Sequence, residues 1–255
     1  MSLILEVKGL NKKVDLSEEN ALHILKDVDL EIEEGEFISV MGPSGSGKST
    51  LLYNVSGMDR LTSGSVKFLS NEINELKEEE LAKLRLNKMG FIFQDINLLK
   101  NLSLIDNVMF PALVSKNVNK HEVYKKAKNL LEMTGIIELA DHNITQASGG
   151  QLQRVGICRA MINHPEIIFG DEPTGALNSK ATSEIMSILS EINKKGTTIM
   201  LVTHDAKVAA RTERVLYMVD GRIVAQKKIH KFDEKYDSIK SREESVMKWL
   251  VENGF

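Results

Sequence analysis

One stretch of the chain combines glycines, hydroxyl side chains and a lysine at a spacing that suits phosphate binding. It fits the pattern GxxxxGK[ST] and consists of Gly42, Pro43, Ser44, Gly45, Ser46, Gly47, Lys48, Ser49 and Thr50. Glycines in such a loop let successive backbone N–H groups turn inward around phosphate oxygens. Lys48 brings a positive charge to the β- and γ-phosphates of a nucleotide, and the Ser49 hydroxyl can bind Mg²⁺. The stretch therefore predicts a nucleotide phosphate site with a magnesium ion.

A phosphate-binding loop of this kind connects a buried strand to the start of a helix. Residues 37–41 are an apolar run of strand length, and residues 48–55 can continue the loop as a helix. The alternative interpretation is a glycine-rich surface turn. This context and three later stretches favour the phosphate loop.

Two acidic residues, Asp171 and Glu172, follow the apolar run of residues 167–169. At the end of a buried strand, an aspartate can hold Mg²⁺ through water, and a neighbouring glutamate can orient or deprotonate an attacking water. Alone, such a pair is equally typical of a helix cap or a solvated turn. In a chain with a phosphate loop, the catalytic interpretation is favoured.

Gln94 and His204 also stand at the ends of expected strands. The Gln94 amide can bind Mg²⁺ and sense the γ-phosphate, and His204 can donate a hydrogen bond to that phosphate. Taken singly, a glutamine is more often a surface residue and a histidine more often a structural one. Both are candidates because the same chain carries a phosphate loop and the acidic pair.

A second candidate anion site begins a later helix and consists of Ser148, Gly149, Gly150 and Gln151. Two glycines and a serine hydroxyl at a helix start offer N–H groups and the positive end of the helix dipole. One chain would then carry two phosphate-binding elements. Either each element serves its own nucleotide, or one nucleotide is shared across a dimer interface.

The apolar patterns elsewhere outline a mixed sheet. Strands are expected at residues 3–7, 24–32, 65–68, 89–93, 167–169 and 198–203, and helices at 78–85 and 180–195. Residues 11–20 are polar and charged and are expected to form a loop. Residues 215–225, with Asp220 and Gly221 at the centre, predict a β-hairpin with a type I′ turn.

From residue 104 to residue 163 the apolar spacing is helical. Val123, Ala127, Leu130 and Leu131 share one helix face, and Gly135 can end that helix. We therefore expect a helical insertion between two strands of the sheet.

The tail after residue 226 is charged and ends in an expected amphipathic helix. Ser241 and Glu244 fit a capping box, and the expected apolar stripe consists of Val246, Met247, Leu250 and Val251. The stripe is expected to pack against the body, and docking on a partner is the alternative.

Composition narrows the class of protein. The chain has 255 residues, 42% of them hydrophobic, which is enough for a large α/β core. No apolar run has the length that crosses a bilayer, and no signal-peptide pattern begins the chain. The single Cys158 excludes an internal disulfide and suits a reducing compartment. The net charge of −3 argues against nucleic acid as the main partner.

In this order, the motifs resemble those of the ATP-binding cassette family, the ATPase subunits of ABC transporters, over nearly all of residues 3–225. The resemblance implies Walker A at residues 42–50, the Q-loop at Gln94, the signature at residues 148–151 with Arg154, Walker B at Asp171, the catalytic glutamate at Glu172, the D-loop at residues 175–178 and the switch histidine at His204. It also implies ATP and Mg²⁺ as cofactors.

The fold that the resemblance implies is α/β: a P-loop NTPase core of the ABC ATPase type, with an antiparallel β subdomain and an inserted α-helical subdomain. Residues 1–225 would form this ATPase domain, with the helical subdomain at about 95–163, and residues 226–255 a C-terminal extension. In that family two cassettes close head to tail on ATP and drive a membrane permease. A second copy of this chain, a permease and a place at the cytoplasmic face of the membrane are therefore expected.

Within the family, residues 62–64, 91–94 and 171–175 resemble the branch that handles lipoprotein release, macrolide export and cell-division signalling. Residues 175–179 and 204–211 are more similar still to bacitracin-type antimicrobial-peptide resistance transporters. An ATPase that drives such a permease is the favoured function. A subunit that signals through a membrane partner without moving substrate, or extracts lipoproteins, is the alternative. An ATPase acting on nucleic acid or the ribosome is disfavoured because the chain has one phosphate loop and no sustained heptads.

Three departures from the family pattern stand out. Ala147 replaces the usual leucine of the signature, and Asn178 replaces an aspartate of the D-loop. The aromatic residue that stacks on adenine is missing, because Val14 or Asp15 occupies its place and the nearest ring is His23. Selectivity for ATP over GTP is accordingly expected to be weak.

Overall fold

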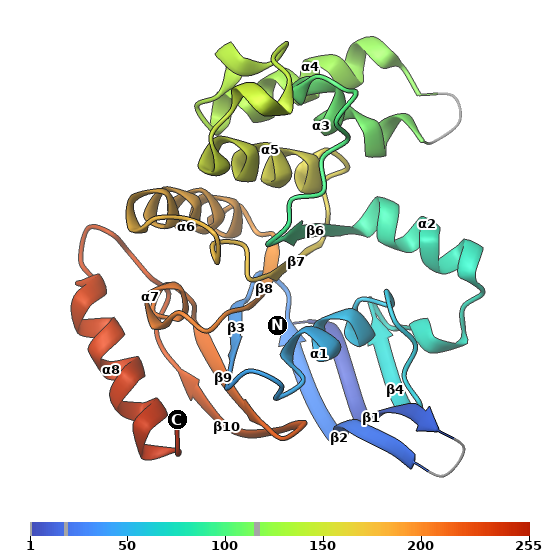
Figure 1. Cartoon of the computed structure of the whole chain (residues 1–255), viewed down its shortest axis with the longest axis vertical. Helices are drawn as coiled ribbons and strands as arrows, with labels where there is room; N and C mark the ends of the chain where they lie inside the picture. Colours follow the sequence, from blue (N-terminus) through green and yellow to red (C-terminus); the bar gives the residue numbers. More distant parts are fainter. Residues whose placement is uncertain (1, 18–19, 115–117) are drawn as a thin grey trace.

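Six strands form the larger sheet, in the spatial order β10-β9-β3-β8-β7-β6 (Figure 1). They are β3 (Phe37–Met41), β6 (Met89–Phe93), β7 (Ile167–Asp171), β8 (Thr198–Val202), β9 (Arg214–Val219) and β10 (Arg222–Lys228). The strands from β9 to β6 run parallel, and β10 returns antiparallel to β9. Parallel strands need cover on both faces, which explains their unbroken apolar runs. The computed structural model describes residues 2–17, 20–114 and 118–255.

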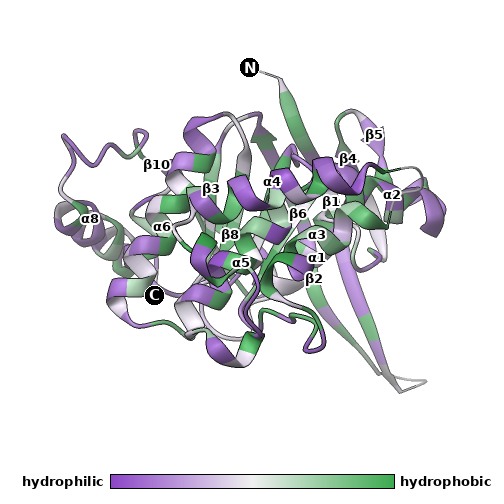
Figure 2. Ribbon diagram, turned by 90° about the horizontal axis from the view of Figure 1, so that it is seen from above, coloured by the Kyte–Doolittle hydropathy of each residue, from purple (hydrophilic) through white to green (hydrophobic). Residues whose placement is uncertain are grey.

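Helices cover both faces of this sheet. On one face, α1 (Lys48–Val55) packs in a core shared with the smaller sheet, and on the other α6 (Ser179–Lys194) packs against β7 and β8. Figure 2 shows the hydrophobic colouring concentrated over the central strands. The hairpin predicted around Asp220 and Gly221 joins β9 to β10, with φ angles of 46° and 82°. Positive φ at both positions agrees with a type I′ turn.

The smaller sheet has the order β2-β1-β4-β5 and is antiparallel. Its strands are β1 (Leu3–Ser17), β2 (Asn20–Glu33), β4 (Ser63–Phe68) and β5 (Asn71–Glu72). The loop predicted at residues 11–20 is wrong over its described part, because β1 continues to Ser17 and pairs with β2; residues 18 and 19 lie outside the described residues. A polar stretch indicates exposure to water, and an exposed hairpin satisfies that condition as well as a loop does.

Between the neighbouring strands β6 and β7 the chain forms a helical subdomain, at the top of Figure 1. It contains α3 (Leu104–Leu113), α4 (Lys120–Met133), α5 (Gly149–Met161) and the 3₁₀ turns η2 (Ile137–Leu139) and η3 (Ile144–Gln146). These elements enclose an apolar core of their own. Ala147, which stands where the family usually has a leucine, packs against this core. Gly135, with φ of 68°, follows α4, and the N–H of Ile136 donates to the carbonyl of Leu131. This is a Schellman ending of the helix, as the glycine predicts.

Before β6 lie η1 (Ile73–Glu75) and α2 (Glu78–Lys88), and after β8 comes the short α7 (Ala206–Ala209). None of the helices in the described ranges has both the length and the apolar character to cross a membrane.

The C-terminal helix α8 (Ile239–Glu252) packs on α7 and β9. The predicted capping box at Ser241 is wrong, because Ser238 caps the helix and its hydroxyl accepts from the Ser241 N–H. Val246 and Leu250 are fully buried, whereas Met247 and Val251 are 37% and 62% exposed. The stripe is therefore narrower than predicted, because residues one position on lie about 100° further round the helix and face solvent.

Candidate nucleotide-binding and catalytic site

The loop from Gly42 to Gly47 leaves the end of β3 and enters α1, as its sequence predicts. Gly42 is required by close approach, because a Cβ there would lie 2.0 Å from the Met218 carbonyl oxygen. Gly47 caps α1 with φ of 97°, which side chains rarely adopt. Among the described residues, the buried Ser46 hydroxyl finds no hydrogen-bond partner. A glycine-rich loop with an unpaired buried hydroxyl fits a phosphate ligand.

Lys48 is the first residue of α1 and is only 8% exposed. Its ammonium donates to the carbonyl oxygens of Gly42 and Pro43, each at 2.9 Å. Burial lowers the pKa of Lys48, and the charges of Glu172 and Asp171 partly offset this effect. The lysine is thus held inside its own loop by two neutral acceptors, and an anion in the loop would stabilise its charge.

Ser49, the residue after Lys48, contacts Asp171 at the end of β7. The Ser49 hydroxyl donates to Oδ1 of Asp171 at 2.8 Å, while the hydroxyl of Tyr53 donates to Oδ2 at 2.6 Å. Burial raises the pKa of Tyr53 to about 12, and the hydrogen bond to Asp171 adds to the shift. Tyr53 was not among the candidate residues named from the sequence, although its spacing of four residues from Ser49 puts both on one helix face.

Glu172 and His204 end the neighbouring strands β7 and β8, and 3.1 Å separates Oε2 of the glutamate from Nδ1 of the histidine. The backbone of Glu172 has φ of 45°, and its N–H donates to the carbonyl of Val202 at 3.0 Å. A Cβ at Gly175 would lie 3.2 Å from the Glu172 carboxylate and 3.3 Å from the Gln94 amide. The ends of β6, β7 and β8 thus bring Gln94, Glu172 and His204 close together.

The described part of the chain holds no group of three or more His, Cys, Asp or Glu side chains that could bind a metal by themselves. A cation at this position would take its protein ligands from the Asp171 carboxylate, the Ser49 hydroxyl and the solvent-exposed amide of Gln94. These oxygen donors suit Mg²⁺, which keeps several waters and takes the rest of its ligands from nucleotide phosphates. The donor set therefore fits the predicted magnesium ion.

Beside the loop lies a cleft of about 530 Å³, lined by Leu22, His23, Ile24, Lys26, Ser44, Gly45, Gly47, Lys48, Ser49, Thr50, Glu172, Asp220 and Gly221. One wall of this cleft comes from β2. Val14 lies directly opposite Leu22 in the β1–β2 pairing, so both side chains lie on the same face of the hairpin.

His23 is held in place within this wall. Oδ1 of Asn11 accepts from the Asp27 N–H at 3.1 Å and lies 2.8 Å from Nε2 of His23. Because that oxygen only accepts, Nε2 carries a proton and donates to it. The hydrogen bond therefore holds the imidazole in one orientation.

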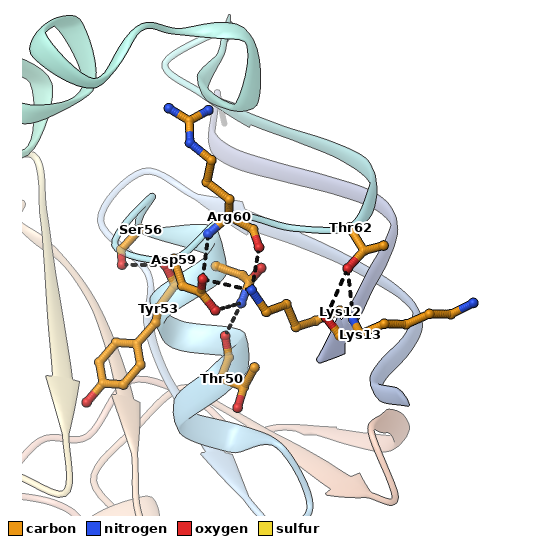
Figure 3. Close-up of polar contacts among 9 residues, drawn as sticks. Lys12, Lys13, Thr50, Tyr53, Ser56, Asp59, Arg60 and Thr62 are labelled. Carbon is orange, nitrogen blue, oxygen red and sulfur yellow. Dashed lines mark hydrogen bonds and ion pairs between the residues drawn. The ribbon is translucent and has the colours of Figure 1, made fainter. Parts of the chain in front are cut away.

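A polar network fixes the hairpin relative to α1 (Figure 3). Nζ of Lys12 donates to Oδ1 of Asp59 at 2.8 Å and to the carbonyl of Arg60 at 2.7 Å. Asn54 joins the same network by donating to Oδ2 of Asp59 at 3.4 Å, and it also donates to the Thr50 carbonyl within α1 at 2.9 Å. The wall of the cleft and the phosphate loop are thereby held together.

The second candidate anion site lies in a separate cleft of about 400 Å³, whose lining includes Ser148, Gly149, Gly150, Gln151, Arg154, Asn178 and Lys180. Ser148 caps α5 in a capping box with Gln151. The two clefts share none of their lining residues, so the described chain does not bring Ser148 to Lys48. Asn178 caps α6 by accepting from the Ala181 N–H at 2.9 Å, which an aspartate would also do.

Comparison with known proteins agrees with this architecture. The sequence profile of the family described as "ABC transporter" matches residues 25–175. The chain is 42% identical over 236 residues to the uncharacterized ABC transporter ATP-binding protein MJ0796 of Methanocaldococcus jannaschii, across 91% of this chain and 100% of that one. It is 42% identical over 232 residues to the bacitracin export ATP-binding protein BceA of Halalkalibacterium halodurans, across 91% and 90% of the two chains.

A further relative is the macrolide export ATP-binding/permease protein MacB of Aggregatibacter actinomycetemcomitans, which is 43% identical over 222 residues. The match covers 87% of this chain but only 34% of MacB. Among solved structures, a dimeric structure of MJ0796 has a TM-score of 0.83 at 40% identity, covering 89% of this chain and 100% of that one. Another, of a post-hydrolysis state of MJ0796 bound to ADP and Pi, has a TM-score of 0.82 at the same identity and coverage. The chain therefore belongs to the ABC transporter family, as an ATP-binding and ATP-hydrolysing subunit that uses Mg²⁺.

Proposed function

We propose that this chain binds ATP at the loop of residues 42–50 and hydrolyses it with the side chains at the ends of β6, β7 and β8. The observation that carries the proposal is the convergence of Lys48, Asp171 and Glu172 on one site. Charges of Asp171 and Glu172 act on the Lys48 ammonium, and Lys48 and Glu172 line the same cleft. In this proposal residues 1–225 form the ATPase domain, with the helical subdomain at about 95–163 and an extension at 226–255.

Phosphate binding is assigned to Lys48 and the N–H groups of the loop. Ser49, Gln94 and Asp171 would hold Mg²⁺, which supplies positive charge to the phosphates when bound. Lys48 would exchange the carbonyls of Gly42 and Pro43 for phosphate oxygens, which are stronger acceptors for an ammonium. This exchange favours nucleotide binding because the buried lysine gains a full counter-charge.

Glu172 is the proposed general base, and His204 its partner. The 3.1 Å contact with Nδ1 of His204 holds the Glu172 carboxylate at the edge of the cleft, where it can take a proton from the attacking water. Through its other ring nitrogen, His204 can donate a hydrogen bond to the γ-phosphate. Phosphoryl transfer needs mainly such positioning and charge neutralisation, which these residues supply.

The base of the nucleotide is proposed to pack against the β1–β2 hairpin. His23 would provide the ring, with its Nε2 held by Asn11, and Leu22, which lines the same cleft, would provide an apolar neighbour. An imidazole offers a smaller stacking surface than a tyrosine ring. Because stacking contacts only the face of the base, this contact would accept either adenine or guanine.

We propose that the active form is a head-to-tail dimer of two copies of this chain. Two anion sites in separate clefts of one chain, at Lys48 and at Ser148, support an arrangement in which the signature of each copy completes the site of the other. The relative MJ0796 is described as dimeric in its solved structures, which agrees with this arrangement.

A membrane permease is the proposed partner, with the chain at the cytoplasmic face of the membrane. An apolar groove of about 430 Å³ lies between the core and the helical subdomain, and its lining includes Met58, Leu86, Met89, Phe91, Phe93 and Pro111. Gln94 directly follows Phe93, so a permease segment in the groove would touch the residue next to the proposed metal ligand. The BceA relative, a bacitracin export protein, supports antimicrobial-peptide resistance as the physiological role.

Phosphate release by the purified chain tests the ATPase assignment. We expect Mg²⁺-dependent hydrolysis that Glu172→Gln abolishes, and its persistence in that variant would contradict the proposal. Bacitracin sensitivity of a strain that lacks this chain tests the physiological role. The strain should regain resistance with the wild-type chain and fail to do so with Glu172→Gln.

A further inference from the structure

The Asp171 carboxylate receives a hydrogen bond on each of its two oxygens, and both donors come from α1. The hydroxyl of Ser49 reaches Oδ1 at 2.8 Å and that of Tyr53 reaches Oδ2 at 2.6 Å. The first donor belongs to the phosphate loop. The second has no place in any of the motifs that the sequence pointed to, and its hydrogen bond is the shorter of the two.

We propose that Tyr53 is a positioning residue for the metal-binding carboxylate, which it holds by Oδ2 so that Oδ1 faces Ser49 and the cation. This inference rests on the proposed function, because it assigns a role to Tyr53 within the same magnesium site. Tyr53 itself is not a ligand in this arrangement.

The geometry suits this role in two ways. A carboxylate held at both oxygens loses the freedom to rotate, so a metal that requires near-ideal octahedral geometry finds Oδ1 already aimed. Occupation of Oδ2 also leaves Oδ1 as the carboxylate oxygen that would face the cation, directly or through a bound water.

Tyr53 is itself held firmly. Its carbonyl accepts from the Ser56 hydroxyl at 3.2 Å and from the N–H of Met58 at 2.9 Å, and its ring packs against the main core. In Figure 3 the ring extends away from the Lys12–Asp59 network that ties this end of α1 to β1. The phenol is thus presented to Asp171 from a fixed backbone.

The test measures how much Mg²⁺ tightens the binding of a fluorescent ATP analogue to the purified chain. Dissociation constants are compared in EDTA and at saturating Mg²⁺, and their ratio is the gain from the metal. Tyr53→Phe, which removes only the hydroxyl, should bind the analogue equally well in EDTA. It should lose about tenfold of the gain, the lower end of what loss of a partner of a metal ligand costs. Tyr124→Phe, on the exposed side of α4, is the matched control and should keep the full gain.

A second comparison distinguishes positioning from a general structural role. Because Tyr53 acts through Asp171, adding Tyr53→Phe to Asp171→Asn should change the gain by less than about twofold. A further loss in that background, an unchanged gain in Tyr53→Phe alone, or equal weakening in EDTA would each overturn the proposal. Failure of the proposed function has a different signature, since the wild-type chain would then bind the analogue no better than Lys48→Ala.

Discussion

His204 meets Glu172 through Nδ1, at 3.1 Å from Oε2, although the two residues come from different strands and 32 positions separate them in the sequence. The parallel pairing of β7 with β8 brings the carboxyl ends of both strands to the same edge of the sheet. The histidine side chain is 63% exposed and that of the glutamate 25%, so the pair faces the opening of the site. A proposed base and the group that orients it are therefore carried on rigid strands, and the ligand side stays open.

The two members of this pair should fail differently when substituted. Glu172→Gln should leave ATP binding within about twofold and lower the hydrolysis rate by about 10²-fold or more, because the neutral amide takes no proton from water. His204→Ala should also lower the rate while Glu172 keeps its charge. Single-turnover phosphate release, measured beside equilibrium ATP binding, separates the chemical step from binding.

The double variant gives the sharper result. If His204 acts partly by holding Glu172, the losses from Glu172→Gln and His204→Ala should not add, since residues that act as a unit are non-additive. Fully additive losses would mean that His204 works independently of the glutamate. Normal turnover in Glu172→Gln would remove Glu172 from the mechanism.

Lys48→Ala should weaken nucleotide binding both in EDTA and in Mg²⁺. The lysine supplies the main protein cation for the phosphates, and its side chain is buried inside the loop that would hold them. The affinity for ATP should drop by more than tenfold, and turnover should be lost. Equilibrium binding of ATP, with Lys26→Ala as a control for charge at the rim of the same cleft, checks this expectation.

Much of the fold follows from local sequence chemistry. The loop from Gly42, the buried strands β3, β7 and β8, the turn at Asp220 and the end of α4 at Gly135 were all predictable, because glycine needs and apolar runs are local signals. The length of β1 was not predictable in the same way. Its outer half is polar and forms a strand only because β2 supplies a paired neighbour.

The residues of the site also divide into those that local motifs predict and those that depend on tertiary contacts. Lys48, Asp171, Glu172 and His204 could be named from motifs, whereas Tyr53 and Asn11 act through contacts that only the folded chain creates. Ser241 illustrates the opposite error. It has the right type for a helix cap, but Ser238 stands three residues earlier and caps the helix instead.

Base selectivity should be weak. GTP is expected to compete with ATP within about an order of magnitude, less than roughly 1.4 kcal/mol, because phosphate contacts do not distinguish the two bases. His23→Ala should weaken both nucleotides, and His23→Tyr should strengthen both by up to about tenfold through a larger ring. Competition binding with ATP and GTP measures all three chains. A hundredfold preference for ATP, or indifference to both substitutions, would exclude the imidazole as the base contact.

The C-terminal helix should depend on Arg242 for its attachment. This arginine is 6% exposed and donates to the carbonyls of Ala210, Thr212 and His230. Arg242→Ala would leave buried carbonyls without donors and should lower the free energy of unfolding by about 2–4 kcal/mol. Lys248→Ala, on the exposed side of α8, should change it by less than about 0.5 kcal/mol. Urea denaturation of the three proteins compares them, and equal stabilities would refute the anchoring role.

The remaining prediction concerns the cleft of Ser148, which the described chain leaves apart from Lys48. If the signature of one copy completes the ATP site of the other, ATP binding and dimerisation are linked, and each favours the other. The chain should be mostly monomeric without nucleotide. Glu172→Gln, which binds ATP without hydrolysing it, should shift to a dimer when ATP is added.

Adding Ser148→Arg to Glu172→Gln should abolish that shift, because the arginine places bulk and charge at the start of α5. Ser148 also caps α5, so the substitution removes a cap worth about 1 kcal/mol as well. Ser148→Ala in the same background removes the cap without the bulk and should retain much of the dimer. Sedimentation with and without ATP compares the three proteins. A dimer that persists with Ser148→Arg would show that Ser148 does not lie at the shared site, and equal loss with Ser148→Ala would assign the effect to the helix cap alone.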